Sequence, residues 1–464
     1  MDRKLLLLAG IASFSSAGMA AEHTNFVIIN LDDAGFGDFS YNGAYGYTTP
    51  HIDRMAAEGM RFTHFLAAQP VSGASRAGLL TGCYPNRIGF HGAPGPDSDF
   101  GIHPDEMTLG ELLKQKDYST AIYGKWHLGD SKQFLPLQNG FDEYYGLPYS
   151  NDMWPYHPQT KFPDLPTIEN NDIVGYNTDQ SAFTTDYTGR AVRFIKKNRD
   201  KPFFVYLAHS MPHVPLAVSD KFKGKSEQGL FGDVMMEIDW SVGEILRVLR
   251  ELNLEENTLV ILTSDNGPWI NYGNHAGSTG GLREAKGATF EGGNRVPCIM
   301  YWKGKIEAGA TCNKLASNID LFPTVADISG APLPGRTIDG VSLLPLMKQE
   351  EGANPRTHFI YYYNKNDLEA VTDGRFKLIF PHSHRTYEAY PPGNDGNPGK
   401  VIMREITRCE LYDLRRDPGE RYDVFTQYPD VAMRLMGVAD AMREELGDDL
   451  TKKKGENRRM SGRK

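Results

Sequence analysis

The sequence has few cysteines, no apolar run long enough to span a membrane and no excess of positive charge. Four cysteines at irregular spacing in 464 residues predict neither a disulfide framework nor a metal site. Without an apolar run of membrane length, we expect no stable membrane insertion. The formal net charge of -9 argues against nucleic-acid binding, so an anionic ligand would have to be held by a few local cations.

The amino terminus has the form of a signal peptide. A charged start at residues 1–4 precedes an apolar segment at residues 5–13, and small residues follow up to Ala20. This order is typical of a leader that is removed on export. We therefore expect a signal peptide at residues 1–20 and a mature protein that is periplasmic or secreted.

Four apolar runs predict buried parallel strands, and each run ends in a cluster of polar side chains. The runs lie at residues 26–31, 120–123, 203–208 and 259–262. Apolar residues at helical spacing lie between them, most clearly at residues 108–115, 185–198 and 232–252. This alternation predicts an α/β sheet covered by helices on both faces, a fold in which ligands bind at the carboxyl ends of the strands.

The character of the sequence changes near residue 350. Short β-like segments joined by Pro/Gly turns follow, and a helical pattern at residues 431–445 precedes a basic stretch at residues 452–464. We therefore divide the mature chain into a larger α/β domain at residues 21–349, which would carry the catalytic site, and a smaller α+β subdomain at residues 350–464. We expect the basic stretch to be a solvated tail.

Ser72 is predicted to stand at the entrance to a helix, because its polar, turn-prone neighbours run directly into Arg76-Ala-Gly-Leu-Leu80. The first turn of a helix has unpaired N–H groups and the positive end of the helix dipole, which together favour an anion. A nucleophile here would face a negatively charged substrate. A serine taken alone is more often a helix cap, and that alternative stays open.

Oxygen-bearing side chains follow the first and the last of the predicted strands. They are Asp32, Asp33, Asp265 and Asn266. Several hard oxygen donors at one sheet edge, with no nearby cysteine or histidine, suit Ca²⁺ or Mg²⁺ better than Zn²⁺. Two such pairs after two buried strands favour a metal site over ordinary loops.

Five basic side chains could surround this metal. They are Arg76, Lys125, His127, His213 and Lys286. Each alone is more often a surface or structural residue. Together they would form a cationic pocket with two proton-transfer groups, which is the equipment for cleaving an ester of a small oxyanion.

Two segments match the signatures of one enzyme family. Ser72-Gly-Ala-Ser-Arg76 fits a pattern of Cys or Ser, any residue, Pro or Ala, any residue and Arg, and residues 118–129 fit a second signature. By these segments the sequence resembles the formylglycine-dependent sulfatases. Further similar segments cover most of the mature chain in family order, at residues 31–38, 212–215, 264–267, 286–297 and 411–418, and residues 141–150 resemble the arylsulfatase A-like branch.

This resemblance implies a fold and a reaction. The fold would be alkaline-phosphatase-like, with a mixed, mostly parallel sheet between helices and a C-terminal subdomain of antiparallel sheet plus terminal helix. Ser72 would be oxidised to formylglycine, whose hydrate attacks the sulfur of a sulfate ester. One Ca²⁺ would be held by Asp32, Asp33, Ser72, Asp265 and Asn266.

The resemblance also assigns roles to the basic side chains. Arg76 and Lys125 would stabilise the hydrate and the sulfate. His127 would take the proton that releases sulfate, while His213 and Lys286 would bind the ester and assist the leaving oxygen. A plain serine would form a sulfate ester without an easy exit, whereas a geminal diol can collapse, so these roles agree with the chemistry.

Two residues depart from the usual family pattern. Residue 72 is serine where the family also has cysteine, which implies a serine-accepting, radical-type formylglycine-generating maturase of bacterial kind as a partner. An unmodified chain should be inactive. Ala74 stands where proline is commoner, which weakens the match slightly.

The substrate is the least defined part. Polar and aromatic loops near the predicted active edge could bind a sugar or be ordinary loops, and their candidate substrate residues are Asn151, Asp152, Trp154, His209 and His275. The resemblance favours a sulfated saccharide of mucin or glycosaminoglycan type. Two alternatives stay open: a phosphate or phosphonate monoester hydrolase of the same superfamily, and a non-catalytic pseudo-sulfatase that binds sulfated glycans with Ser72 unmodified.

Overall fold

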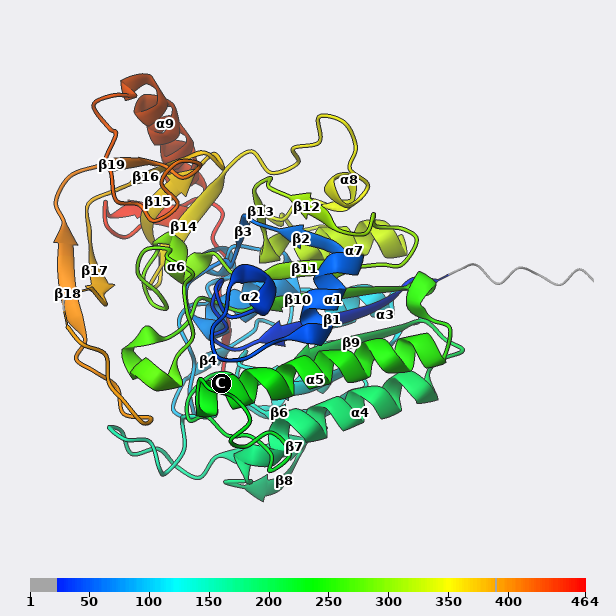
Figure 1. Cartoon of the computed structure of the whole chain (residues 1–464). Coiled ribbons are helices and arrows are strands. Elements are labelled where there is room, and N and C mark those ends of the chain that lie inside the picture. The colour runs from blue at the N-terminus through cyan, green and yellow to red at the C-terminus, as the bar shows by residue number, and fades with distance from the viewer. Residues whose placement is uncertain (1–22, 389) are drawn as a thin grey trace, which may run out of the picture.

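A computed structural model describes residues 23–388 and 390–464 (Figure 1). The predicted signal peptide at residues 1–20 lies outside the described residues. None of the helices in the described ranges is long and apolar enough to cross a membrane.

A large mixed sheet forms the centre of the molecule. Within the described residues it has ten strands in the order β12-β2-β11-β10-β1-β9-β5-β6-β7-β8. Their bounds are β1 Asn25–Leu31, β2 Met60–Phe62, β5 Ser119–Lys125, β6 Glu143–Leu147, β7 Pro166–Glu169, β8 Asp172–Tyr176, β9 Phe203–Ala208, β10 Thr258–Ser264, β11 Cys298–Tyr301 and β12 Ala310–Cys312. The central strands β10, β1, β9, β5 and β6 are parallel, which confirms the four predicted parallel strands. Strands β11, β7 and β8 run antiparallel to their neighbours.

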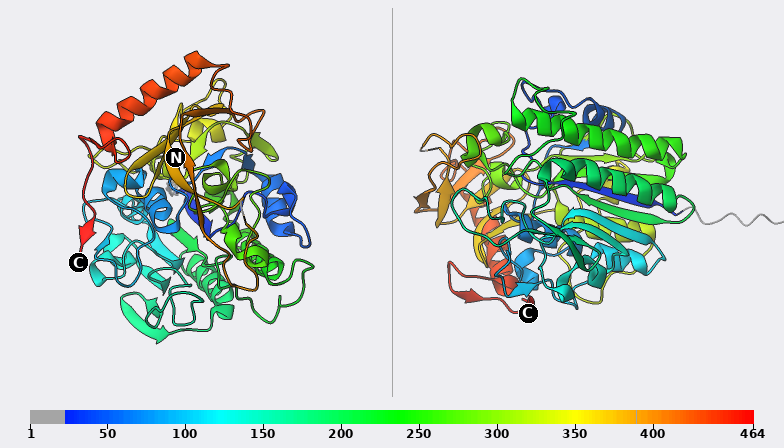
Figure 2. Two further views of the ribbon diagram at one scale, coloured as in Figure 1. Left: turned by 90° about the vertical axis from the view of Figure 1, so that its left-hand side faces the viewer. Right: turned by 90° about the horizontal axis from the view of Figure 1, so that it is seen from below.

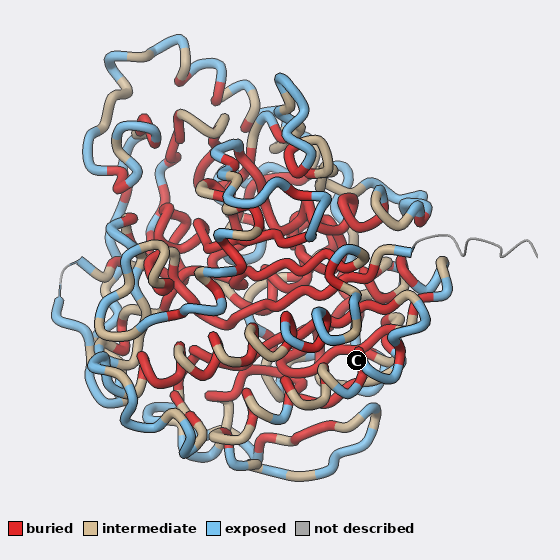
Figure 3. The backbone as a smooth tube through the Cα atoms, turned by 45° about the vertical axis from the view of Figure 1, so that its right-hand side comes forward, coloured by how far each residue is buried: buried red, intermediate tan, exposed pale blue. Residues whose placement is uncertain are grey.

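Helices cover both faces of this sheet, as predicted. Alternate side chains of β1 point to opposite faces, so that Phe26 and Ile28 belong to one core and Val27 and Ile29 to the other. The first core includes α2 (Ser72–Thr81), α3 (Leu109–Lys114) and α7 (Leu321–Ser329), and the second includes α1 (Pro50–Glu58), α4 (Phe183–Lys197) and α5 (Leu230–Glu251). Figure 2 shows α4 and α5 side by side along one face of the sheet. Figure 3 shows that the central strands are buried and that the outer turns of the covering helices are more exposed.

The C-terminal part has its own antiparallel sheet and core. The sheet order is β14 (Phe359–Tyr363), β15 (Asp367–Thr372), β16 (Phe376–Ile379) and β19 (Glu410–Asp413). Helix α9 (Pro429–Leu446) packs against it through Leu435 and Ala439. A separate hairpin, β17 (His382–Thr386) with β18 (Ile402–Ile406), extends from this sheet. The predicted antiparallel sheet and terminal helix are confirmed.

Several short elements connect these layers. They are β3 (Phe65–Leu66), which pairs with β13 (Ala316–Ser317), the helices α6 (Glu291–Asn294) and α8 (Leu344–Met347), and the 3-10 helix η7 (Ile270–His275).

Most of the basic stretch at residues 452–464 is exposed, as predicted for a solvated segment, but it is paired with other parts of the chain and is not a free tail. Strand β21 (Lys453–Lys454) pairs with β20 (Gly447–Asp448), and β22 (Gly462–Arg463) pairs with β4 (Phe100–Gly101) of the larger part. In the left view of Figure 2 this red segment runs from α9 along the side of the molecule. Arg459 Nε also lies 2.7 Å from Glu106 Oε1, 353 positions away in the sequence, and such a distant partner cannot be found from a local run of charges.

Candidate active site

Polar side chains gather at the carboxyl edge of the parallel strands, where ligands bind in sheets of this kind. Strands β1, β5, β9 and β10 end beside one another, and the first turn of α2 lies at the same edge. The predicted residues that end or follow these strands are Asp32, Asp33, Lys125, His127, His209, His213, Asp265 and Asn266.

Ser72 is the first residue of α2 and is only 1% exposed. Its hydroxyl donates to Asp32 Oδ1 at 3.2 Å and lies 3.4 Å from Asn266 Oδ1. The N-cap of α2 is Val71, and no side chain in the described chain caps this helix. The alternative that Ser72 serves as the helix cap is therefore wrong.

The five predicted metal ligands lie within hydrogen-bonding reach of one another. The Asp33 amide donates to Asp265 Oδ1 at 3.1 Å, and Asn266 Nδ2 donates to Asp33 Oδ1 at 2.7 Å, which leaves Asn266 Oδ1 directed at Ser72. Three buried carboxylates, an amide oxygen and a hydroxyl form the hard donor set that Ca²⁺ prefers. The donors present thus fit a calcium ion.

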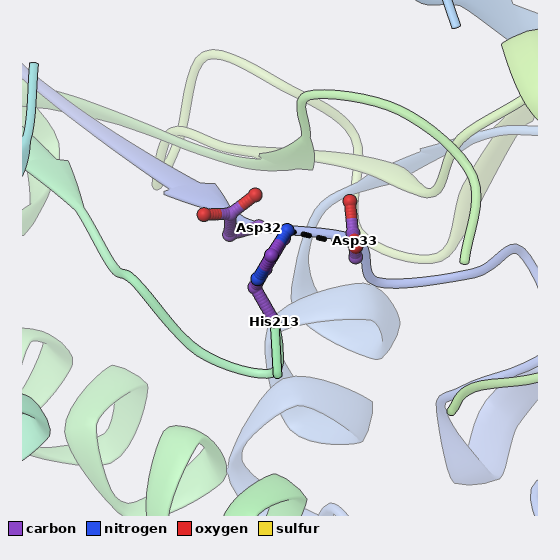
Figure 4. Close-up of side chains that lie close together, drawn as sticks. All are labelled: Asp32, Asp33 and His213. Atoms are coloured by element: carbon purple, nitrogen blue, oxygen red, sulfur yellow. Dashed lines mark ion pairs between the residues drawn. The ribbon is translucent and has the colours of Figure 1, made fainter. Parts of the chain in front are cut away.

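A histidine stands beside these carboxylates, in the pocket where the sequence analysis expected His213. His213 Nε2 lies 3.5 Å from Asp33 Oδ2 (Figure 4). Ligand atoms of Asp32, Asp33 and His213 all lie within 4.8 Å of one another. His213 Nδ1 donates to the carbonyl of Val214, which fixes the orientation of the ring.

Three cations neutralise the three carboxylates. Lys125 Nζ lies 2.6 Å from Asp32 Oδ2. Arg76 Nη2 lies 2.8 Å from Asp265 Oδ2, and Lys286 Nζ lies 2.8 Å from Asp33 Oδ1. Because these groups are almost fully enclosed, their charges act on one another with little screening by solvent.

The enclosed charges shift the proton affinities of the site. Burial alone would raise the pKa of Asp32, but the charges of Lys125, His213 and Arg76 hold it well below its ordinary value. Burial and the neighbouring Asp32 raise the pKa of Asp265 to about 6. The two carboxylates therefore differ in proton affinity although they share one site.

His127 is a neutral, unengaged base. Burial, followed by the charges of Lys125 and Arg76, lowers the pKa of His127 well below its ordinary value. Neither of its ring nitrogens has a hydrogen-bond partner among the described residues. The imidazole can therefore accept a proton from a neighbouring hydroxyl.

Comparison with known proteins identifies the family. The model of the family described as Sulfatase matches residues 24–331. The chain belongs to the sulfatase family. Two C-terminal family models also match, that of the C-terminal region of aryl-sulfatase at residues 354–461 and that of N-sulphoglucosamine sulphohydrolase at residues 285–405.

Known sulfatases resemble this chain over nearly its whole length. The N-acetylgalactosamine-6-sulfatase of Canis lupus familiaris is 38% identical, covering 96% of this chain and 90% of its own. Arylsulfatase A of Bos taurus is 38% identical, covering 92% of this chain and 87% of its own. These relatives confirm the resemblance to the arylsulfatase A-like branch, and the chain is an enzyme of the sulfatase class.

Solved structures agree with the fold. A sulfatase from Pseudoalteromonas sp. aligns with a TM-score of 0.81 at 27% identity, over 90% of each chain. A protein crystallised in complex with neocarrahexaose aligns with a TM-score of 0.74 at 27% identity, over 90% of this chain and 92% of that one. The alkaline-phosphatase-like fold that the resemblance implied is thereby confirmed.

A cavity of about 300 Å³ opens beside His213 in this sulfatase. Three of the predicted substrate residues, Asp152, Trp154 and His275, line it. Val214, which follows His213, Tyr272 and, from the loop at residues 391–400, Asp395 also line it. The C-terminal part therefore shares this cavity with the larger part of the chain.

Two other predicted substrate residues of the sulfatase have structural roles. His209 is 1% exposed, and its Nε2 lies 3.0 Å from Ser241 Oγ of α5, so it belongs to the packing between sheet and helix. Asn151 is fully buried, and its amide donates to Gln180 Oε1 at 3.0 Å and to the His213 carbonyl at 3.4 Å. These contacts engage both side chains within the protein, and their assignment to substrate binding stays a prediction.

Trp269 is a residue of the sulfatase site that the sequence analysis missed. Its ring centroid lies 5.7 Å from that of His213 and 4.5 Å from Lys286 Nζ. Ser150, whose Oγ lies 3.1 Å from Lys125 Nζ, was missed as well. The signal for Trp269 was available, since an aromatic residue directly follows the strand-end segment Asp265-Asn-Gly-Pro268.

Proposed function

We propose that this sulfatase releases inorganic sulfate from a sulfated carbohydrate at residue 72, after Ser72 has been oxidised to formylglycine. The observation that carries the proposal is the position of the Ser72 hydroxyl, in the first turn of α2 and between Asp32 and Asn266. The positive end of the helix and the neighbouring cations would favour a sulfate group there.

One calcium ion and the modified residue would supply the chemistry that the encoded side chains lack. Asp32, Asp33, residue 72, Asp265 and Asn266 would hold the Ca²⁺. The bound ion would offset negative charge on the sulfate oxygens. Formylglycine in its hydrated form would supply the nucleophilic hydroxyl and a route for sulfate to leave.

The basic side chains would then bind the ester and move protons. Arg76 and Lys125 would hold the sulfate, since their charged groups already meet the carboxylates that flank Ser72. His127 would accept a proton at a free ring nitrogen. His213 and Lys286 would bind the ester and assist the leaving oxygen, since the Nδ1 hydrogen bond fixes the His213 ring with Nε2 toward Asp33 and Lys286 Nζ lies 2.8 Å from Asp33 Oδ1.

The substrate class is supported by the relatives and by the cavity beside His213. The named relatives act on N-acetylgalactosamine 6-sulfate or are arylsulfatases, and one structural neighbour holds a neocarrahexaose. Aromatic side chains such as Trp154 and Tyr272, with nearby polar groups, would suit a sugar ring. We therefore propose a glycan of mucin or glycosaminoglycan type.

The proposal includes a maturation partner and an export route. A serine-accepting, radical-type maturase would oxidise Ser72, because a cysteine-specific enzyme could not act on this residue. The leader-like pattern at residues 1–20 supports export to the periplasm or beyond.

Mass spectrometry of the peptide that carries residue 72, from protein made in its native source, tests the proposal. We expect the loss of two hydrogens, together with release of sulfate from 4-nitrophenyl sulfate and from sulfated saccharides. Ser72→Ala is the control, since it keeps the fold and removes the site of oxidation. Unmodified serine throughout would instead support a glycan-binding pseudo-sulfatase, and a strong preference for 4-nitrophenyl phosphate would support a phosphate ester hydrolase.

A further inference from the structure

A second, strongly basic cavity lies between the C-terminal segment and the loop at residues 89–92. It has a volume of about 640 Å³, and seven of its thirteen lining residues are lysine or arginine. The chain as a whole carries a net charge of -9, so this concentration of positive charge is local. A cavity lined in this way favours an anionic ligand.

Only some of these cations are engaged by the protein itself. Lys453 pairs with Glu444, Arg459 with Glu106 and Arg463 with Asp99, and these pairs hold the C-terminal segment in place. Among the described residues, the four lining cations without an ion-pair partner are Lys365, Lys452, Lys454 and Arg458. The segment is thus anchored by one set of charges while a second set faces the cavity.

The basic cavity continues toward the reaction centre. His91, Lys365 and Asp449 line both this cavity and a neighbouring one of about 450 Å³, which also includes Gly92 and Tyr363. The Gly92 carbonyl accepts a hydrogen bond of 2.9 Å from the amide of Ala74, two residues beyond Ser72.

Tyr363 links the same neighbouring cavity to the other side of the centre. A Cβ atom added to Gly287 would lie 3.3 Å from the Tyr363 hydroxyl, so Tyr363 stands beside the residue that follows Lys286. The two adjoining cavities are called the path below; its nearer part is walled by Gly92, which contacts the Ser72 helix, and by Tyr363, which lies beside the Lys286 turn.

The two parts of this path differ in charge. Asn364 and Asp367 line only the part nearer the centre, where an amide and a carboxylate can hydrogen-bond neutral hydroxyls and the carboxylate repels anions. Lys452, Lys454 and Arg458 line only the farther part, while Lys365 and Asp449 line both. A ligand that fits has hydroxyl groups near the centre and a negative charge farther along.

From this pattern we propose that the path binds the extension of an acidic oligosaccharide, with sugar hydroxyls over Asp367 and Asp449 and a second sulfate or carboxylate at the four unpaired cations. The inference rests on the proposed function, and it deepens it by specifying a substrate of several sugar units with more than one negative charge. A nucleic acid fits less well, because a phosphate on every nucleotide would also meet the two carboxylates.

The test compares ligands of different length on the full-length protein. Chondroitin 6-sulfate disaccharide and hexasaccharide are bound to protein with unmodified Ser72, and affinity is measured by calorimetry. We expect the hexasaccharide to bind about tenfold or more tightly than the disaccharide, with an affinity that falls as salt is raised.

A variant without the four unpaired cations should lose this advantage of length. It combines Lys365→Gln, Lys452→Gln, Lys454→Gln and Arg458→Gln. The matched control removes the same charge from four exposed lysines without ion pairs among the described residues, namely Lys201, Lys223, Lys225 and Lys348. The control should keep the tenfold difference, and melting curves establish that both variants fold.

Three outcomes would overturn the inference: equal binding of both lengths by the wild type, an unchanged length advantage in the variant, or tighter binding of a twelve-nucleotide single-stranded DNA than of the hexasaccharide. Failure of the proposed catalytic function can be distinguished from failure of this inference. Oxidised protein that releases no sulfate, while the length advantage and its loss in the variant persist, would refute catalysis and support the binding path.

Discussion

Lys377 of β16 joins the C-terminal sheet to the larger part of the chain through a buried charge cluster. Its Nζ lies 2.8 Å from Glu420 Oε1 and 3.2 Å from Glu291 Oε1, and the three side chains are 0% exposed. Nζ also donates to the Thr289 carbonyl at 2.8 Å. Glu291 and Thr289 belong to the larger part, so one ammonium group holds both parts together.

The substitution Lys377→Met removes this charge while keeping most of the side-chain volume. Glu291 would retain Arg295 at 2.6 Å, whereas Glu420 Oε1 would lose its ion-pair partner and be left buried. Removing one member of a buried pair costs about 3–5 kcal/mol. With an unfolding entropy of about 2.1 cal/mol/K per residue, a chain of 464 residues loses about 1 °C per kcal/mol, so the melting temperature should fall by about 3–5 °C.

The loss should depend on pH in a definite direction. Burial raises the pKa of Glu420 from an ordinary 4.5 to about 7, although Lys377 acts to lower it. Without Lys377 this pKa rises further, so the folded state binds a proton that the unfolded state releases above pH 4.5. The folded state is therefore destabilised as pH rises from 4.5 toward the raised pKa of Glu420. The free energy of unfolding that the variant loses relative to the wild type should be larger at pH 8 than at pH 5.5.

Calorimetric or circular-dichroism melting at both pH values measures these effects. Lys348→Met is the control, because Lys348 is exposed and has no ion pair within the described ranges, and its effect should stay within about 0.5 kcal/mol. A loss at pH 8 no larger than that of the control, or a deficit that grows toward low pH, would refute the reasoning.

Other predictions concern the active centre. His127→Ala should lower kcat by about 10²–10⁴-fold with an unchanged circular-dichroism spectrum, and wild-type turnover would contradict its role. His209→Gln should cost about 1–3 kcal/mol of stability through its contact with Ser241 and change kcat less than about threefold, whereas a large kcat loss at an unchanged melting temperature would return it to the site. EGTA should abolish sulfate release and Ca²⁺ restore it, and Asp33→Asn should raise the Ca²⁺ concentration for half-maximal activity by about tenfold or more; full activity in EGTA would exclude a calcium requirement. Trp269→Leu should lower kcat/KM by about 2–30-fold, the equivalent of about 0.5–2 kcal/mol for a lost cation–π contact, and an unchanged value would remove the ring from the site.

The central strands and their ends could be predicted because each is a continuous apolar run that is buried on both faces. The run at residues 203–208 is strand β9 itself, and the polar residues after β1 and β10 meet because parallel strands end at one edge. The short outer strands of the sheet have no such continuous apolar run. β2 has three residues, and its neighbours β11 and β12 lie more than 200 positions away, so their pairing depends on tertiary structure rather than on local pattern.

The direction in which a side chain points was the second feature that could not be predicted from the sequence. His209 and His213 lie in one short segment, yet one contacts Ser241 in the helical layer and the other contacts Asp33 in the centre. Spacing along an irregular loop does not determine which way a side chain points. The role of the basic C-terminal segment was missed for a related reason, because its acidic partners lie in a different part of the chain.

The pairing of each central carboxylate with its own cation has a consequence for how the binding of two ligands is coupled. Asp32 engages Lys125 and Asp33 engages Lys286, so in this arrangement neither the oxygens nor the ammonium groups are fully available to a ligand. A divalent cation that took the carboxylates would free the lysines, and a sulfate that took the lysines would free the carboxylates. Since thermodynamic coupling is reciprocal, each ion should raise the affinity of the centre for the other, and half-filled states should be scarce.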